Sequence, residues 1–325
     1  MQEQLQNDWQ TKFTPDPVLD DTEKERIVKM LKWPEGKVDV VLDTDTYNEI
    51  DDQFALSYMV KSSDKLNVKA IYAAPFFNEK STGPADGMEK SYHEIIRILE
   101  LLDREDLKDV VYRGSDAYMS AENVPVISDA AKNLAERAMD YSEDNPLYVV
   151  AIGAITNVAS ALLLNPEIRR RIVVVWLGGN ALHWPHNKEF NSFQDVAAAR
   201  VVFGCGVPLV QLPCMGVVSA FTISGPELEY YLKGKNKLCD YLAGVTIKEA
   251  ADHDAEKVWT RVIWDVTAVA WLIDNSFMED YLIHSPIPEY SGRYAEDNGR
   301  HFSRYVYHIN RDKVFTDLVK KLTEE

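Results

Sequence analysis

Short apolar runs rich in β-branched residues alternate with longer amphipathic stretches along most of this chain, from Val38 onward. The runs are VDVVLD (38–43), VKAIYAA (68–74), VVYRG (110–114), LYVVAI (147–152), IVVVWLGG (172–179) and VPLVQLP (207–213). They are apolar throughout, which is typical of parallel strands covered on both faces. The stretches between them with helical patterns are 51–62, 87–102, 156–164 and 195–203. This order predicts an α/β fold with an open, mostly parallel sheet and helices on both faces.

The two ends of the chain depart from this pattern. After Pro226 the chain is mainly helical until RYVYHI (304–309) and a final amphipathic helix over 313–322. Residues 38–325 contain no internal repeat or low-complexity tract, so we expect one α/β domain there with a mainly helical C-terminal part. Residues 1–37 are expected to form an N-terminal helical extension. One face of its helix carries Ile27, Met30 and Leu31.

The composition excludes several classes of protein. The formal net charge is −17, which disfavours a partner held through its phosphates, so we expect no nucleic acid polymer as a partner. The three cysteines, Cys205, Cys214 and Cys239, are an odd number without CxxC spacing. They support neither a disulfide scaffold nor a zinc ribbon and fit a reducing compartment.

Targeting and membrane segments are also not indicated. The first residues, MQEQLQNDWQ, are polar and acidic, whereas a secretory signal needs a basic start followed by an apolar stretch. No segment approaches the roughly 20 uninterrupted apolar residues of a membrane span. We therefore expect a cytoplasmic protein without a membrane partner.

Five carboxylates lie within ten residues after the first predicted strand, in VVLDTDTYNEIDD. They are Asp43, Asp45, Glu49, Asp51 and Asp52. Asp51 and Asp52 also suit the first turn of a helix, where acids complement the helix dipole. Asp43 and Asp45, however, emerge from a buried strand, where neighbouring carboxylates must take up protons or find a cation. With no nearby His or Cys, oxygen ligands favour Ca²⁺ or Mg²⁺ over zinc.

Two enzyme classes begin with Asp-x-Asp after a first strand. In phosphatases of the haloacid dehalogenase type, Thr or Val usually stands two residues after the second aspartate, where this chain has Tyr47. The later acidic pair of that class is also missing from IVVVWLGGN, so a metal-dependent phosphatase remains as an alternative. The segment resembles more closely the signature DxDxxxDD of nucleoside hydrolases. Here the stretch between the two acidic pairs, 46–50, is two residues longer than in that signature.

Two further segments resemble this family. Asn78 follows the second predicted strand, where the family has an asparagine that contacts ribose; a turn-forming role is the alternative. VVAIGAITNVASALL resembles the segment in which a threonine gives its main-chain carbonyl to calcium. Thr156 is the matching residue, and its alternative role is the N-cap of the following helix.

The segment after the fifth predicted strand, GGNALHWPHNKEFN, resembles the family segment whose Glu and Asn bind ribose hydroxyls. Glu189 and Asn191 match these two residues. A further family asparagine near the 5′-hydroxyl has two candidates, Asn180 and Asn187, of which we prefer Asn180. The order of the motifs along the chain matches the family order.

The last match is KVWTRVIWDVTAVAWLI, in which Trp264 and Asp265 lie in a run predicted to be helical. An aspartate among apolar residues is costly unless it is paired or bound to a metal. In the family the equivalent aspartate completes the calcium site. The preceding residue is His in inosine-uridine preferring members and Trp in purine-specific members, so this chain resembles the purine-specific arrangement.

The resemblance implies a complete site. Ca²⁺ would be held by the side chains of Asp45, Asp52 and Asp265 and by the carbonyl of Thr156. Asp45 would also be the catalytic base, because calcium acidifies water only modestly. The ribose would be bound by Asp51, Asn78, Asn180, Glu189 and Asn191. Trp264 would stack on the base, and the candidates for a proton donor to it are His183, His186 and His253.

The implied function is calcium-dependent hydrolysis of the N-glycosidic bond of ribonucleosides, with a preference for purines. Because family members often form dimers or tetramers, the resemblance also implies a homodimer or homotetramer. A non-catalytic nucleoside-binding protein of the same nucleoside hydrolase-like fold is the second alternative, kept open by the longer acidic motif.

Overall fold

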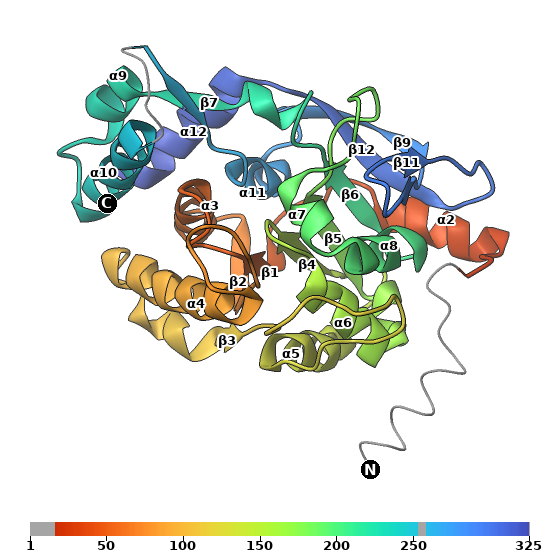
Figure 1. Ribbon diagram of the computed structural model, residues 1–325. Helices are drawn as coiled ribbons and strands as arrows, with labels where there is room; N and C mark the ends of the chain where they lie inside the picture. Colours follow the sequence, from red (N-terminus) through yellow and green to blue (C-terminus); the bar gives the residue numbers. More distant parts are fainter. Residues whose placement is uncertain (1–16, 253–257, 325) are drawn as a thin grey trace.

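The computed structural model describes residues 17–252 and 258–324 of the chain (Figure 1). Within those residues the central sheet has eight strands in the order β3-β2-β1-β4-β5-β6-β12-β9. All neighbours are parallel except β12 and β9. The strands are β1 (Val38–Thr44), β2 (Leu66–Ala73), β3 (Val111–Arg113), β4 (Leu147–Ala151), β5 (Ile172–Leu177), β6 (Leu209–Leu212), β9 (Met278–His284) and β12 (Phe302–Ile309). The predicted open, mostly parallel sheet is confirmed.

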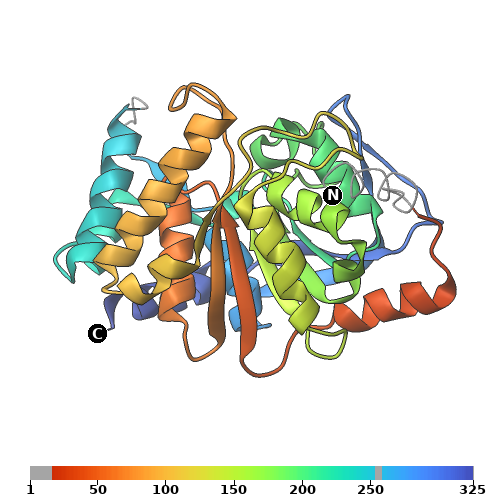
Figure 2. The ribbon, with the colours of Figure 1, turned by 90° about the horizontal axis from the view of Figure 1, so that it is seen from below.

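Helices connect the strands and pack on both faces of the sheet (Figures 1 and 2). Their bounds are α2 (Asp21–Met30), α3 (Asp51–Lys61), α4 (Pro84–Leu101), α5 (Asp129–Arg137), α6 (Thr156–Leu164), α7 (Phe190–Gln194), α8 (Val196–Gly204), α9 (Gly225–Glu227), α10 (Lys237–Asp252), α11 (Val266–Ile273) and α12 (Arg311–Thr323). Short 3-10 helices are η1 (Glu105–Val110), η2 (Ala138–Asp140), η3 (Pro166–Arg170) and η4 (Val218–Ala220), and η5 (Leu228–Leu232) is a π-helical turn.

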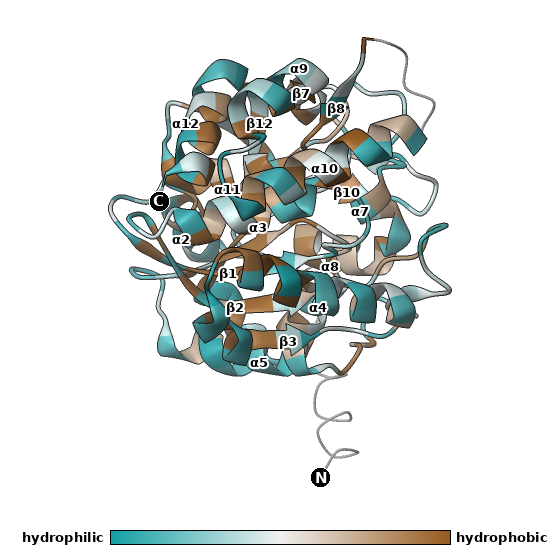
Figure 3. Ribbon diagram, turned by 90° about the vertical axis from the view of Figure 1, so that its left-hand side faces the viewer, coloured by the Kyte–Doolittle hydropathy of each residue, from teal (hydrophilic) through white to brown (hydrophobic). Residues whose placement is uncertain are grey.

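Two hydrophobic cores form because successive strand residues point to opposite faces. On β1, Val40 and Leu42 belong to one core and Val41 to the other. Helices α3, α4, α10, α11 and α12 contribute to the first core, and α5, α6 and α8 to the second. In Figure 3 the strands β1 and β2 are largely brown, while α4 alternates between brown and teal. This amphipathic pattern is the one expected of a helix that covers a buried sheet.

The N-terminal helix is docked on the domain. Asp20 caps α2 by accepting a hydrogen bond of 2.8 Å from the Glu23 N–H, and the face predicted to be apolar is buried. The helix contacts β12, and the Nε of Arg304 on that strand donates to the carbonyl of Leu31. The division of the chain at residues 1–37 and 38–325 stays a prediction.

From Thr222 onward the chain contains helices, as expected after Pro226, but also strands that the apolar pattern did not indicate. These are the edge strand β9 and the short antiparallel pairs β7 (Thr222–Ser224) with β8 (Thr260–Val262) and β10 (Ile287–Pro288) with β11 (Tyr294–Ala295). The run around Trp264 is therefore not helical throughout, since α11 begins only at Val266. Among the residues described, no helix combines the length and apolar character that a bilayer crossing requires.

Candidate active site

A pocket of about 240 Å³ opens at the carboxyl edge of the sheet, where the strand order reverses between β1 and β4. In open α/β sheets this reversal leaves a crevice in which ligands bind. The pocket walls come from the ends of β1, β4, β5 and β6 and from the start of α11. Its lining residues are Asp45, Asn48, Glu49, Asp51, Asp52, Ile152, Leu177, Asn180, His186, Lys188, Glu189, Phe190, Asn191, Cys214, Met215, Trp264 and Asp265.

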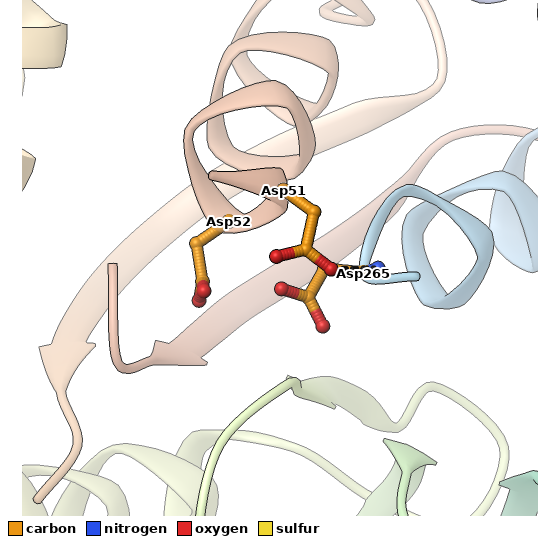
Figure 4. A group of neighbouring side chains, drawn as sticks. All are labelled: Asp51, Asp52 and Asp265. Carbon is orange, nitrogen blue, oxygen red and sulfur yellow. Dashed lines mark hydrogen bonds between the residues drawn. The ribbon is translucent and has the colours of Figure 1, made fainter. Parts of the chain in front are cut away.

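Three buried aspartates converge on one side of this pocket (Figure 4). Asp51 and Asp52 come from the first turn of α3, and Asp265 directly precedes α11. One carboxylate oxygen from each lies within 4.8 Å of the others, which is close enough for a shared metal ion. The Asp265 N–H donates to Asp51 Oδ2 at 3.4 Å, and Thr44 donates its hydroxyl proton to Asp52. Asp51, which we expected to bind ribose, thus lies in the acidic group itself.

Asp45 lies directly after β1, beside this group. Both of its carboxylate oxygens are buried and have no hydrogen-bond partner among the residues described. Gly153 makes room for the carboxylate, since a Cβ there would lie 3.1 Å from Asp45 Cγ. Burial raises the pKa of Asp45 well above its usual range, and the charges of Asp52 and Asp51 add to the effect. A buried carboxylate without a partner requires either a proton or a cation.

Burial also raises the pKa values of Asp265, Asp52 and Asp43. The pKa of Asp265 is raised well above its usual range by burial, then by Asp51 and Asp52. Burial raises the pKa of Asp52 to about 6. It raises that of Asp43 to about 7, although Asn157 Nδ2 donates to Asp43 at 2.8 Å. A divalent cation in the pocket would therefore displace protons when it binds.

Thr156 lies behind the pocket rather than in its lining. It is the first residue of α6, whose N-cap is Ile155, so the N-cap role considered for its hydroxyl is wrong. That hydroxyl instead donates to Asp195 Oδ2 at 2.7 Å, and the same oxygen accepts the Met119 N–H at 2.9 Å. The other oxygen of Asp195 caps α8 through the N–H of Ala198. Asp195 therefore joins two helix ends and the loop that contains Met119.

The pocket side chains that follow β5 are fixed by hydrogen bonds. Glu189 accepts the N–H groups of Gly179, Asn191 and Ser192 at 2.7–2.9 Å, which also caps α7. The amide nitrogen of Asn191 donates to carbonyls at the ends of β4 and β5. Asn180 lines the pocket, whereas Asn187 lies behind it and accepts the Asn180 N–H at 2.8 Å.

Three ring systems line the described pocket and are placed for contact with a base, those of Trp264, His186 and Phe190. Trp264 is half-buried and next to Asp265 in the chain, and His186 is exposed. Of the other histidines considered, His183 is absent from the lining as far as the structure describes it, and His253 lies outside the described residues.

Asn78, expected to contact ribose, is outside the pocket lining in the described part of the chain. Its Nδ2 donates at 2.7 Å to Oδ1 of Asn48, and Asn48 does line the pocket. Sequence reasoning missed Asn48 because the family signature has no counterpart for the longer stretch. It also missed Cys214, although the rule that ligands bind after strand ends would have selected this residue behind β6.

Fold and site together define an α/β protein with a carboxylate-lined ligand pocket at the reversal of a parallel sheet. Residues 40–315 match the model of the family described as inosine-uridine preferring nucleoside hydrolase, and the chain belongs to this family. It is thus a hydrolase that acts on N-glycosyl bonds of ribonucleosides, which decides against the phosphatase alternative.

Individual relatives differ in the base that their names give. The pyrimidine-specific ribonucleoside hydrolase RihA of Klebsiella pneumoniae (strain 342) is 27% identical over 248 residues, which cover 69% of this chain and 76% of that protein. The structure of a purine-preferring ribonucleoside hydrolase from Gardnerella vaginalis matches with a TM-score of 0.72 and 20% identity, over 88% of this chain and 98% of that one. The plant nucleoside hydrolase PpNRh1 has a TM-score of 0.71 and 21% identity, over 90% and 100% of the two chains. These two structures support the fold.

Proposed function

We propose that this enzyme requires Ca²⁺ and prefers purine ribonucleosides, from which it releases ribose and free base. The observation that carries the proposal is the group of buried aspartates, with the partnerless carboxylate of Asp45 beside it and Trp264 in the same pocket. Assembly into a homodimer or homotetramer and a cytoplasmic location stay predictions.

The donor set fits a hard divalent cation. Its members are carboxylates, and oxygen ligands are those that Ca²⁺ takes. Asp52 and Asp265 would hold the ion with Asp45 and the carbonyl of Thr156, and Asp51 is close enough to join them. When bound, the cation neutralises the buried carboxylates and polarises water.

The chain's own residues account for the rest of the reaction. Asp45 takes the proton from the attacking water, since its oxygens have no other partner in the described structure. The ribosyl group becomes positive as the bond to the base breaks, and the carboxylates around it stabilise that charge more than they stabilise the neutral substrate. Asn180, Glu189 and Asn191, which also line the pocket, hold the ribose.

The departing base leaves against Trp264. The π face of the indole favours a base that is gaining a proton, by about 0.5–2 kcal/mol. That amounts to at most about thirtyfold in rate, so a proton donor is also needed. His186 is the histidine we propose for this role, because it lines the pocket with Trp264.

The test is a comparison of kcat/KM for inosine, adenosine, guanosine, uridine and cytidine, each after chelation and after return of Ca²⁺ or Mg²⁺. We expect turnover only with the cation returned, Ca²⁺ the better of the two, and higher kcat/KM for the purines. Faster turnover of uridine or cytidine would overturn the purine preference, and full activity after chelation would overturn the metal requirement.

A further inference from the structure

The stretch between the two acidic pairs, residues 46–50, brings a polar side chain into the pocket that the family signature does not provide. Asn48 is only 6% exposed and lines the pocket. It follows Asp45 by three residues, and its N–H donates to the Asp45 carbonyl at 2.7 Å. The stretch therefore folds back as a tight turn that places Asn48 beside the acidic group.

The orientation of the Asn48 amide follows from a chain of hydrogen bonds. The Lys80 main-chain N–H donates at 2.9 Å to Asn78 Oδ1, and because a main-chain N–H can only donate, this fixes which corner of Asn78 is oxygen. The other corner, Nδ2, donates at 2.7 Å to Asn48 Oδ1. The oxygen of Asn48 is thereby engaged, and its opposite corner carries two N–H donors.

Further contacts hold Asn48 in place. The Lys80 ammonium donates to the Asn48 carbonyl at 2.7 Å, and the same ammonium forms an ion pair of 3.1 Å with Glu249 on α10. Glu249 is 8% exposed and also pairs with Arg261. Asn48 is thus fixed by its N–H, its carbonyl and its side-chain oxygen before any ligand binds, which lowers the entropy cost of a contact with a ligand.

The pocket around Asn48 is rich in acceptors. Asp45, Glu49 and Asp51 line it nearby, and an ionised carboxylate can only accept hydrogen bonds. A sugar hydroxyl can donate to a carboxylate and accept from an amide at the same time. An N–H donor next to carboxylates is therefore a complementary site for a hydroxyl oxygen.

We propose that Asn48 donates a hydrogen bond from Nδ2 to a ribose hydroxyl oxygen, and that Asn78 is a positioning residue that orients the Asn48 amide. The inference rests on the proposed function, because it needs a ribonucleoside in this pocket. It assigns to Asn48, three positions before Asp51, the ribose contact that the sequence resemblance gave to Asn78.

The first test removes the donor. Asn48→Ala should lower kcat/KM for inosine about tenfold, the usual effect of one lost hydrogen bond. It should also erase the penalty for one missing hydroxyl among 2′-, 3′- and 5′-deoxyinosine, while the other two penalties stay as in wild type. A general loss of structure would not remove one penalty selectively. If wild type turns over inosine and all three penalties persist in N48A, the inference is overturned.

The second test turns the amide around without touching the pocket. In N78D one oxygen still accepts from Lys80, but the other can no longer donate to Asn48. Asn48 must then direct Nδ2 toward the new carboxylate and its oxygen toward the substrate. N78D should therefore lose the same hydroxyl penalty as N48A. The matched control is N67D on β2, whose Nδ2 bonds Asp39 far from the pocket, and it should keep all three penalties.

A binding measurement tests this inference separately from the proposed function. Titration calorimetry in the D45N background measures the Kd of inosine and its three deoxy analogues without turnover. Adding N48A should raise the Kd of inosine about tenfold and make it equal to the Kd of one analogue. If wild type does not hydrolyse inosine but this pattern appears, the proposed function fails and the inference stands. Equal Kd values with and without N48A, or no binding at all, overturn it.

Discussion

At the scale of single residues, the unusual feature is the number of carboxyl groups buried at a pocket whose lining, as far as the structure describes it, has no buried cationic side chain. Lys188 and His186 line the pocket, but both are exposed, whereas Asp45, Asp51, Asp52 and Asp265 are buried. Such a group costs stability unless protons or a metal ion neutralise it. The arrangement is therefore one that selection for stability alone would not retain, which supports a role in catalysis.

The substitution Asp45→Asn separates stability from activity. The amide has no charge to bury, so the metal-free variant should be at least as stable as wild type. Its kcat should fall by about a thousandfold, because proton removal from water is lost. Thermal unfolding and initial rates of base release check both expectations. A variant with near-normal kcat would show that Asp45 is not the base.

Trp264→His tests base selection. Without the indole, purines lose the stacking contribution of about 0.5–2 kcal/mol, so kcat/KM for inosine should fall about tenfold relative to that for uridine. The measurement is the ratio of the two values in the variant and in wild type. Trp184→His is a control, because Trp184 packs near the core but outside the described pocket lining. An unchanged ratio in W264H would exclude Trp264 from base recognition.

At the scale of elements, the ends of α6 and α8 hold the back of the site through Asp195. Removing its carboxylate leaves the buried Met119 N–H and the Thr156 hydroxyl without their acceptor. Asp195→Ala should therefore lower the free energy of unfolding by about 3 kcal/mol. It should also lower kcat, because Thr156 loses the hydrogen bond that orients it.

Denaturant unfolding and kinetics with inosine measure these two effects. The matched control is Asp20→Ala, which removes the exposed cap of α2 and should cost about 1 kcal/mol without changing kcat. If D195A kept its kcat at saturating metal, the orientation of Thr156 would not matter to the reaction.

Most elements could be predicted from the sequence, because their apolar pattern is local. The helix predicted over 156–164 is found as α6 with the same bounds, and the strand predicted over 38–43 ends one residue later as β1. The edge strand β9, MEDYLIH, escaped prediction because partner pairing along β12 stabilises it, and its own residues are mostly exposed or half-buried.

Site residues that directly follow strand ends could be predicted from the sequence. Site residues whose placement depends on hydrogen bonds between distant side chains were harder to predict. Asp45, Glu189 and Trp264 were expected in the site and line the pocket. Asn48 lines the pocket in place of Asn78, and a hydrogen bond joins the two side chains across loops that are 30 residues apart in the sequence. No local pattern predicts such a bond.

At the scale of the whole molecule, the strand order explains why these distant residues meet. The chain runs outward from β1 in one direction to β3 and, after β4, in the other direction to β6. The carboxyl ends of β1 and β4 therefore diverge into helices on opposite faces and leave the crevice open. The cost of filling this crevice with carboxylates should make stability depend on pH and metal.

Without metal, stability should fall as the pH rises. The pKa of Asp43 is raised to about 7 and that of Asp52 to about 6, from about 3.9 in the unfolded chain. The folded state therefore binds more protons, and this contribution is complete below about pH 4 and lost as the pH rises through 6 and 7. Calcium should raise Tm more at about pH 8 than at about pH 5, since it competes with these protons.

Thermal unfolding in chelator and in Ca²⁺ across this range checks the expectation. An equal effect of calcium at both ends of the range would mean that the ion binds away from the acidic group. In a D52N variant, which lacks one of the raised groups, the pH dependence in chelator should be weaker.

The central claim is that the acidic group holds a cation with which the enzyme cleaves the N-glycosidic bond of ribonucleosides. The most direct measurement follows inosine by proton NMR with the full chain, first with chelator and then with excess Ca²⁺. We predict ribose and hypoxanthine in equal amounts after Ca²⁺ is added, and neither before. Unchanged inosine after long incubation with Ca²⁺, despite measurable binding, would contradict the claim and favour a nucleoside-binding protein that does not catalyse hydrolysis.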